Sequence, residues 1–272
     1  MLKRPRVRVR PIGTLSLNRM IPNILTLLAL CAGMTAIRFA LGAKFETAAV
    51  AIIVAGILDG IDGRIARLLK GTSTFGAQLD SLSDFVSFGV APAMLLYIWT
   101  MHDFSSIGWV LVLLFAVCCA LRLARFNTQI GADLPPYAYN FFTGVPAPAG
   151  AGLVLIPMFA CFEFETSIFR SPYLNAVVLA AVAALMVSRV PTFSFKRFRV
   201  PGHWVLPMLL VIGALAAFVT TEPWATLLII GAIYVGSFPV SIRSFRRLRR
   251  AAEELRAGGI GRQIGEPPPR SE

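Results

Sequence analysis

Charged residues are scarce in this chain of 272 residues: Asp, Glu, Lys and Arg together make up 15% of it, whereas hydrophobic residues make up 56%. A typical soluble domain carries about 25% charged residues, because its surface must be covered by groups that water solvates. The composition therefore excludes an ordinary soluble protein. It predicts an integral membrane protein.

Histidine and cysteine are also rare, with two and four residues respectively. The cysteines all lie inside apolar segments, without the paired spacing of a zinc site and without a cluster of histidines. We interpret them as small buried hydrophobic residues rather than as metal ligands. They are Cys31, Cys118, Cys119 and Cys161.

Long hydrophobic runs, in contrast, are abundant. A helix needs about 20 apolar residues to cross the hydrocarbon core of a bilayer, and continuous apolar runs of this length exclude a β-barrel, whose strands alternate. We therefore predict an all-α integral membrane protein with about eight transmembrane helices. The predicted spans are 22–42, 46–68, 85–101, 107–127, 143–162, 173–189, 204–220 and 223–242.

The 26 basic residues are distributed unevenly around these spans. If the N-terminus is cytoplasmic, 22 of them fall in the N-terminal segment, the cytoplasmic connections or the C-terminal tail. This distribution follows the positive-inside rule and predicts that both termini are cytoplasmic. The net charge of +12 thus indicates an anionic lipid surface as the partner, and we expect no nucleic acid partner.

Four aspartates stand at the ends of two apolar segments. Asp59 and Asp62 are three residues apart, and Asp80 and Asp84 are four apart, so on helices each pair projects from one face. Clusters of carboxylates suit hard divalent cations, Mg²⁺ above all, which also bind phosphate oxygens of a substrate. A single aspartate near a helix end is as often a cap or a solvated residue. Four at this spacing favour a site for a metal-bound phosphate.

The segment around these aspartates fits the pattern Asp59-x2-Asp62-Gly63-x2-Ala66-Arg67-x8-Gly76-x3-Asp80-x3-Asp84. This pattern resembles the signature of the CDP-alcohol phosphotransferase family, with all eight fixed positions filled. The resemblance implies an enzyme that holds two divalent ions, Mg²⁺ or Mn²⁺, on the four aspartates, and in which Asp84 is also the general base. It further implies nucleotide-binding positions, which are Gly63, Ala66, Arg67, Gly76, Asn23 and Thr26.

Three further segments resemble the branch of this family that makes phosphatidylserine: ALRLARFN at 120–127, NFFTGVPAPAGA at 140–151 and SRVPTFSFK at 188–196. The resemblance implies transfer of the phosphatidyl group from CDP-diacylglycerol to L-serine, with CMP released. The serine carboxylate needs a cation, and Arg122 or Arg125, with Asn127 beside them, are the candidates for serine or phosphate binding. The alternative is that these arginines only anchor the cytoplasmic end of the span.

Two other functions compete with this reading. The same chemistry could use glycerol 3-phosphate, inositol phosphate or choline as the acceptor, although a phosphorylated acceptor calls for more clustered cations than this sequence offers. An ion-coupled transporter would bind its ion with intramembrane acids. Against a transporter, the acids gather at one membrane face, and no other predicted span carries paired charge along a pathway.

The chain divides into four segments. We predict a basic cytoplasmic N-terminal segment (1–21), a catalytic core (22–200), two additional transmembrane helices (201–242) and a basic, disordered cytoplasmic tail (243–272). We expect the protein in a bacterial inner or plasma membrane, with its active site facing the cytoplasm. Small residues in the sixth span would permit close packing of two copies, as in a homodimer: Ala180, Ala181, Ala183 and Ala184.

Overall fold

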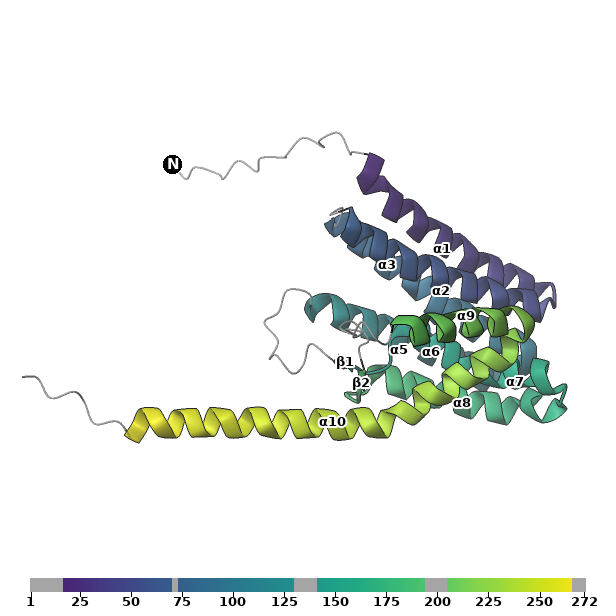
Figure 1. The fold of residues 1–272 in the computed structure, drawn as a ribbon. Helices are drawn as coiled ribbons and strands as arrows, with labels where there is room; N and C mark the ends of the chain where they lie inside the picture. Colours follow the sequence, from purple (N-terminus) through teal and green to yellow (C-terminus); the bar gives the residue numbers. More distant parts are fainter. Residues whose placement is uncertain (1–16, 70–72, 130–140, 194–204, 266–272) are drawn as a thin grey trace, which may run out of the picture.

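The computed structural model describes residues 17–69, 73–129, 141–193 and 205–265, which form a helical protein with one two-stranded sheet (Figure 1). The α-helices are α1 (Leu17–Leu41), α2 (Phe45–Leu68), α3 (Thr74–Asp84), α4 (Ala91–Leu96), α5 (Ser105–Gln129), α6 (Ala147–Val154), α7 (Ile156–Phe164), α8 (Pro172–Val187), α9 (Val205–Thr221) and α10 (Pro223–Gly265). Shorter elements are the π-helices η1 (Phe85–Val90) and η2 (Tyr97–Met101), the 3-10 helix η4 (Ser167–Arg170), and strands β1 (Phe141–Thr143) and β2 (Pro191–Phe193).

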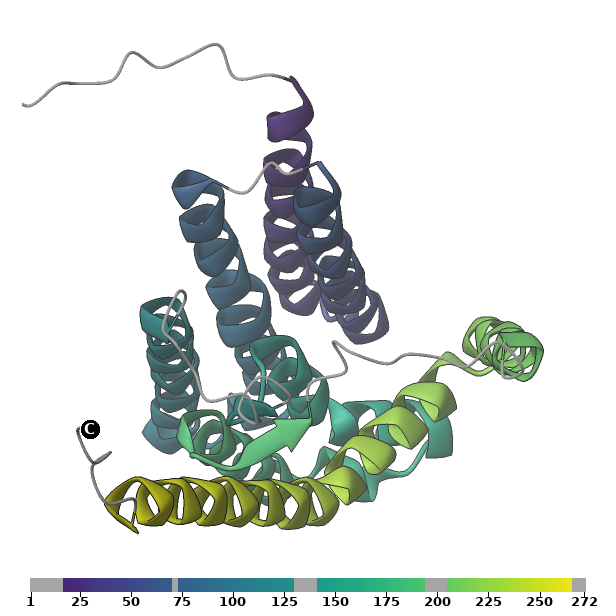
Figure 2. The ribbon, with the colours of Figure 1, turned by 60° about the vertical axis from the view of Figure 1, so that its left-hand side comes forward.

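Helices α1 and α2 run side by side, with α3 beside them (Figures 1 and 2). Alanine fills much of the core at these helices, and Ala36, Ala40 and Ala48 are completely buried. Small side chains let helix backbones approach closely, which is how helices pack without a hydrophobic driving force in lipid. At residue 33 the close packing requires glycine, because a Cβ at Gly33 would lie 2.5 Å from the hydroxyl oxygen of Ser87 in η1.

The segment from Thr74 to Met101 is one helical unit, formed by α3, η1, α4 and η2 in turn. We predicted a span at 85–101, and the structure begins the helix about three turns earlier, with Ser73 as its N-cap: the Ser73 hydroxyl accepts a hydrogen bond from the Gly76 amide at 2.9 Å. Asp80 and Asp84 therefore lie within a helix. The π-helical turn of η1 follows directly after Asp84, and such turns often occur at functional sites.

The predicted span 143–162 is broken in the structure. Helices α6 and α7 meet at an angle of 41° near Leu155, and Pro157 lies in the first turn of α7. Before α6, strands β1 and β2 pair antiparallel, with Phe142 opposite Thr192. The sequence analysis did not predict this sheet, because three-residue strands carry no readable alternation of polar and apolar residues.

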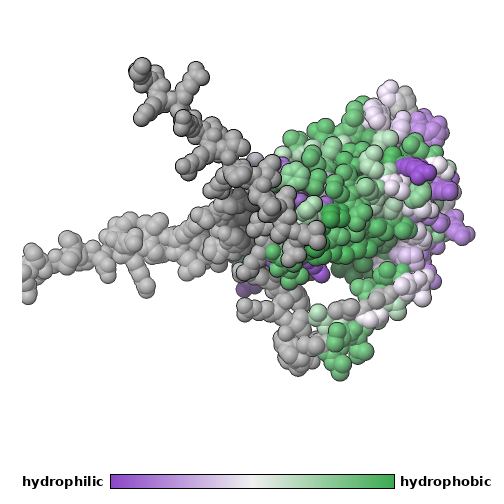
Figure 3. Space-filling model, turned by 90° about the horizontal axis from the view of Figure 1, so that it is seen from above, coloured by the Kyte–Doolittle hydropathy of each residue, from purple (hydrophilic) through white to green (hydrophobic). Residues whose placement is uncertain are grey.

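The surface between the two ends of the bundle is strongly apolar, and Figure 3 shows this band beside a polar rim at one end. Among the described residues, four helices are long and apolar enough to cross a membrane, or five if α6 and α7 form one span. An all-α membrane protein is thus confirmed, whereas eight spans are not. Helices α8 and α9 have only 16 and 17 residues, and α2 carries charged residues in its last turns.

The C-terminal helix α10 is 43 residues long and continues to Gly265 without interruption. Our prediction that the tail is disordered is wrong for residues 243–265; residues 266–272 lie outside the described part of the chain. The physical reason is that the tail is rich in Ala, Leu, Glu and Arg, which are good helix formers, and it extends a helix that is already nucleated.

Candidate active site

Three of the predicted aspartates, two on α2 and one on α3, bring their carboxylates together. The carboxylate oxygens of Asp59, Asp62 and Asp80 that can serve as ligands all lie within 4.8 Å of one another. Asp62 is buried, and Asp59 and Asp80 are partly exposed. A cluster of oxygen ligands with one open side is the arrangement that Mg²⁺ and Mn²⁺ use when they bind both a protein and substrate phosphates.

Asp84 lies one turn after Asp80 on the same helix, and its carboxyl is at hydrogen-bonding distance from Asp59. Four carboxylates so close together repel one another strongly when all are ionised. Among the residues that the structure describes, Arg122, near the end of α5, is the cation whose charge acts on both Asp59 and Asp84. One guanidinium cannot balance four carboxylates, so the cluster has the charge expected of a site for bound cations.

Thr26 on α1 connects α1 to both helices that carry the aspartates. Its hydroxyl donates a hydrogen bond of 2.6 Å to the Asp62 carboxylate, and Thr26 itself is buried. Its backbone carbonyl accepts a hydrogen bond from the Ser83 hydroxyl at 3.1 Å, which ties α1 to the helix that carries Asp84. The structure therefore fixes both aspartate-bearing helices to the same turn of α1.

The arginines at the end of α5 have different surroundings. The guanidinium of Arg125 donates hydrogen bonds to the carbonyls of Thr143, Val187 and Ser188 at 2.8 to 3.2 Å, so it holds the sheet region against the end of α8. The guanidinium of Arg122 makes no such carbonyl contact among the described residues; its Cζ lies 5.9 Å from the centre of the Phe126 ring, and its charge acts on Asp84. Asn127 is hydrogen-bonded to Ser81 at 2.9 Å and braces α5 against α3.

The amino-acid pattern and the geometry agree with a comparison against protein-family models. Residues 19–254 match the model described as CDP-alcohol phosphatidyltransferase. The chain belongs to this family. The match includes all four aspartates, Arg122 and most of α10. The site can therefore be compared with those of other members of the family.

Curated relatives in the family carry a consistent name. A protein from Mycobacterium tuberculosis (strain H37Rv) is 38% identical over 250 residues, which are 90% of this chain and 86% of the relative. One from Helicobacter pylori (strain 26695) is 34% identical over 216 residues, 79% of this chain and 87% of the relative. Both are named CDP-diacylglycerol–serine O-phosphatidyltransferase. An archaetidylserine synthase from Methanothermobacter thermautotrophicus is 32% identical over 172 residues, 62% of this chain and 68% of that protein.

The predicted nucleotide-binding residues lie around the aspartates with open space beside them. A Cβ at Gly63 would meet no atom within 4 Å, so this face of α2 is free for a ligand. A Cβ at Gly76 would lie 2.9 Å from the side-chain oxygen of Asn23, so Gly76 lets α1 and α3 approach. Ala66 is partly exposed. Arg67 is exposed, and its Nε donates to the Gly63 carbonyl at 3.0 Å.

Several polar residues of the site region were not predicted from the sequence. Ser81 and Ser83 lie within the signature but at positions that it leaves unspecified, and each joins α3 to a neighbouring helix. Ser241 on α10 donates a hydrogen bond of 2.7 Å to the Pro191 carbonyl of β2. The sequence could have indicated that these serines form hydrogen bonds, because a buried polar side chain in an apolar helix needs a hydrogen-bond partner. The partner of each could be found only in the fold.

Proposed function

We propose that this protein transfers the phosphatidyl group of CDP-diacylglycerol to the hydroxyl of L-serine and so makes phosphatidylserine and CMP. The observation that carries the proposal is the carboxylate cluster of Asp59, Asp62 and Asp80, with Asp84 and Arg122 beside it, in a chain whose relatives carry the name of this activity. The cluster supplies the ligands, the base and the cation that the reaction needs, at the end of an apolar bundle where a lipid can enter.

Asp59, Asp62 and Asp80 would hold the divalent ions, with Asp84 beside the second one. When bound, the ions would neutralise the diphosphate and the charge that develops on the leaving CMP. The oxygen-only donor set and its spacing fit Mg²⁺ or Mn²⁺. Thr26 would orient the Asp62 carboxylate through their hydrogen bond, as the outer partners of metal ligands do.

The chain's own residues account for the proton and the substrate positions. The serine hydroxyl oxygen forms a bond to the phosphorus that carries diacylglycerol, and the bond from this phosphorus to the bridging oxygen of the diphosphate breaks. CMP departs with the electron pair of that bond. Asp84 accepts the proton of the serine hydroxyl, a role that requires hydrogen-bond reach. The open face at Gly63, with Arg67 and Ala66 further along α2, would receive the nucleotide.

Arg122 is the better candidate for the serine carboxylate. Arg125 already donates to three backbone carbonyls, whereas Arg122 has no such bond among the described residues and lies within electrostatic reach of Asp84. We assign Asn127 to the support of Arg122, because its bond to Ser81 fixes the end of α5. A planar guanidinium can bind a carboxylate through two parallel hydrogen bonds, which a lysine cannot reproduce.

The finer topology also belongs to this proposal. We propose eight membrane crossings, with the segments of Thr74–Met101 and α6–α7 each counted as one, and with both termini and the active site in the cytoplasm. The basic residues on the side of the aspartates support this orientation. The division into a core (22–200) and two added helices (201–242) stays a prediction. So does a homodimer, for which Ala181 and Ala184 remain exposed on α8.

The test is the release of CMP by the purified protein with CDP-diacylglycerol and Mg²⁺ or Mn²⁺, in which serine is compared with glycerol 3-phosphate, inositol phosphate and choline. We expect release to depend on serine alone. We expect Arg122→Lys to raise the KM for serine at least tenfold. Lysine cannot form the second of the two parallel hydrogen bonds to the serine carboxylate, and a loss of about 1.4 kcal/mol of binding free energy corresponds to a tenfold change. Arg170→Lys, at the exposed turn η4, is the matched control. Equal activity with another acceptor, or an unchanged KM in Arg122→Lys, would refute the corresponding assignment.

The hydrogen bond from Thr26 to Asp62 yields a separate prediction. Thr26→Val removes the hydroxyl and keeps the shape of the side chain, so the Asp62 carboxylate loses its orienting donor. We expect the concentration of Mn²⁺ that gives half-maximal activity to rise about tenfold or more. The measurement is a metal titration of CMP release. Thr35→Val is the control, because the one side-chain hydrogen bond of Thr35 within the described part of the chain goes to the Cys31 carbonyl of its own helix; a similar shift in both variants would contradict the prediction.

A further inference from the structure

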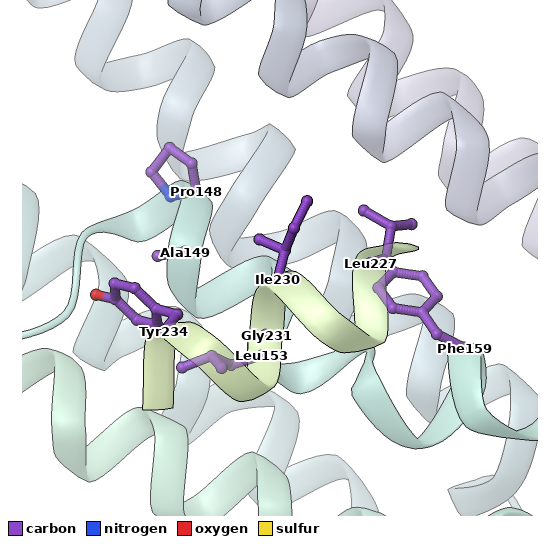
Figure 4. Close-up of a pocket in the computed structure, with 9 residues that line it drawn as sticks. Pro148, Ala149, Leu153, Phe159, Leu227, Ile230, Gly231 and Tyr234 are labelled. Carbon is purple, nitrogen blue, oxygen red and sulfur yellow. The ribbon is translucent and has the colours of Figure 1, made fainter. Parts of the chain in front are cut away.

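A cavity of about 230 Å³ lies between the broken helix α6–α7 and the C-terminal helix α10 (Figure 4). Its lining is almost entirely apolar, and the hydroxyl of the lining residue Tyr234 is buried at one end. The lining residues from α6 and α7 include Pro148, Gly152 and Phe159, and those from α10 include Leu227, Ile230 and Tyr234. No part of the reaction described above uses this cavity.

The cavity has a polar end and an apolar end. Figure 4 shows Tyr234 and Pro148 at one end, and Leu227 and Phe159 at the other. The buried Tyr234 hydroxyl makes no hydrogen bond to a described residue, but it lies within electrostatic reach of Arg122, whose charge also acts on Asp84. The polar end is therefore the end nearest the site of phosphoryl chemistry. The apolar end lies about 10 Å further along α10, because seven residues separate Tyr234 from Leu227.

This polarity matches one part of the substrate. In CDP-diacylglycerol the reacting phosphate and the acyl chains are joined through glycerol esters, so a chain that leaves the active site must pass from a polar to an apolar environment. An acyl chain gains little hydrophobic free energy when it moves from the bilayer into a protein cavity, because both are apolar. It can gain van der Waals contacts in a cavity of matching shape, because the cavity walls pack more closely around it than disordered lipid does. Gly152 lines the cavity, and a Cβ there would meet no atom within 4 Å, so the lack of a side chain leaves this space open. Gly231 has a different role: a Cβ there would lie 2.9 Å from Cδ1 of Ile156, so glycine lets α10 approach α7.

We propose that this cavity binds one acyl chain of the liponucleotide substrate, and that α10 thereby helps to select the length of that chain. The inference rests on the proposed function for the identity of the lipid. It assigns a role to the C-terminal helix beyond its packing against the bundle, in which Trp224 stacks on Phe159 and Ser241 donates a hydrogen bond to β2. A structural bilayer lipid in the cavity is the competing occupant, and the experiment separates the two.

The test fills the cavity from a position that tolerates a side chain. A Cβ at Gly152 would meet no atom within 4 Å, so the first atom of a new side chain has room, and Gly152→Leu places the rest of it at the cavity. Gly236→Leu is the matched control, because Gly236 is equally open, lies on α10 and does not line the cavity. Each purified full-length variant receives an equimolar mixture of dihexanoyl and dipalmitoyl CDP-diacylglycerol, and the two phosphatidyl products are quantified by mass spectrometry.

We expect Gly152→Leu to lower the ratio of long-chain to short-chain product about tenfold, because misfit of a methylene group in an apolar pocket costs a factor of about 10 to 200. Gly236→Leu should keep the wild-type ratio. A bilayer lipid in the cavity predicts instead that both products fall together, and that result would overturn the proposal. A ratio unchanged in Gly152→Leu would overturn it as well.

A second readout does not depend on turnover. CDP-diacylglycerol with a photoreactive diazirine at the end of one acyl chain should label the α10 segment 227–234 in the wild type, and unlabelled CDP-diacylglycerol should compete. Labelling confined to other helices would contradict the proposal. The acceptor can be changed without affecting either test, so a wild-type protein that prefers another alcohol would refute serine as the substrate and leave the acyl-chain site standing.

Discussion

Replacement of Asp84 by Asn should lower kcat about a thousandfold while the protein remains folded. The amide keeps the size of the carboxyl but cannot accept the proton of the attacking hydroxyl, and general bases contribute about 10² to 10⁴ to a rate. The side chain also loses a negative charge beside Asp59 and Asp80, so the fold should not be weakened by the change. The measurement is CMP release at saturating serine and lipid, together with thermal unfolding of the purified variant.

Asp103→Asn is the control for this substitution. Asp103 is exposed, pairs with His102 at 3.1 Å and lies in the turn between η2 and α5, away from the cluster. We expect it to keep its activity. If Asp84→Asn retained more than a tenth of the wild-type kcat, another group would have to accept the proton, and the role of Asp84 would be reduced to that of a metal ligand.

Removal of divalent ions should have a comparably large effect, because the protein alone leaves the carboxylates of Asp59, Asp62 and Asp80 without enough opposing charge. We expect no measurable CMP release in a chelator and full recovery on addition of Mg²⁺ or Mn²⁺. The ions should also stabilise the fold, since a ligand that binds only the native state contributes about 2.7 kcal/mol at a hundred times its Kd. Thermal unfolding with and without the ion measures this directly.

A double variant, Asp59→Asn with Asp80→Asn, makes the metal prediction specific. It removes two of the three clustered carboxylates and should abolish the stabilisation by the ion. A metal-dependent rise in Tm that persists in the double variant would place the binding site elsewhere. Activity that survives the chelator in the wild type would exclude the metal-assisted mechanism as a whole.

The sequence alone predicted which aspartates share a helix face, but it did not predict which residues position them. Spacings of three and four residues place Asp59 with Asp62 and Asp80 with Asp84 on common helix faces, because helical periodicity is a local property. That Thr26 contacts Asp62, 36 residues away, depends on the packing of α1 against α2. The resemblance to a family suggested Thr26; periodicity alone did not.

Arg122 and Arg125 show the same limit. The two residues share a helix face, and the sequence offered both as ligands for a carboxylate or a phosphate. Only the fold shows that the carbonyls of Thr143, Val187 and Ser188 occupy Arg125. The sheet that supplies one of these carbonyls is too short for a pattern to predict. For residues 243–265 we gave the polarity of the sequence more weight than its helix propensity, and so we predicted disorder where the structure has a helix.

The bonds of the site also impose an order on biosynthesis. The ribosome completes α1, α2 and α3 first, and with them the contacts of Thr26 with Asp62 and of Ser83 with Thr26, which join residues 36 and 57 positions apart. Arg122 follows almost forty residues after Asp84, and Arg125 finds its partners Val187 and Ser188, at the end of α8, only 62 and 63 residues later still. Because chains fold from the N-terminus during synthesis, the growing protein carries an acidic cluster without its arginine for part of that time. If the cluster faces the cytoplasm, as we propose, Mg²⁺ would be the available counterion in that interval, and assembly as well as catalysis would then depend on it.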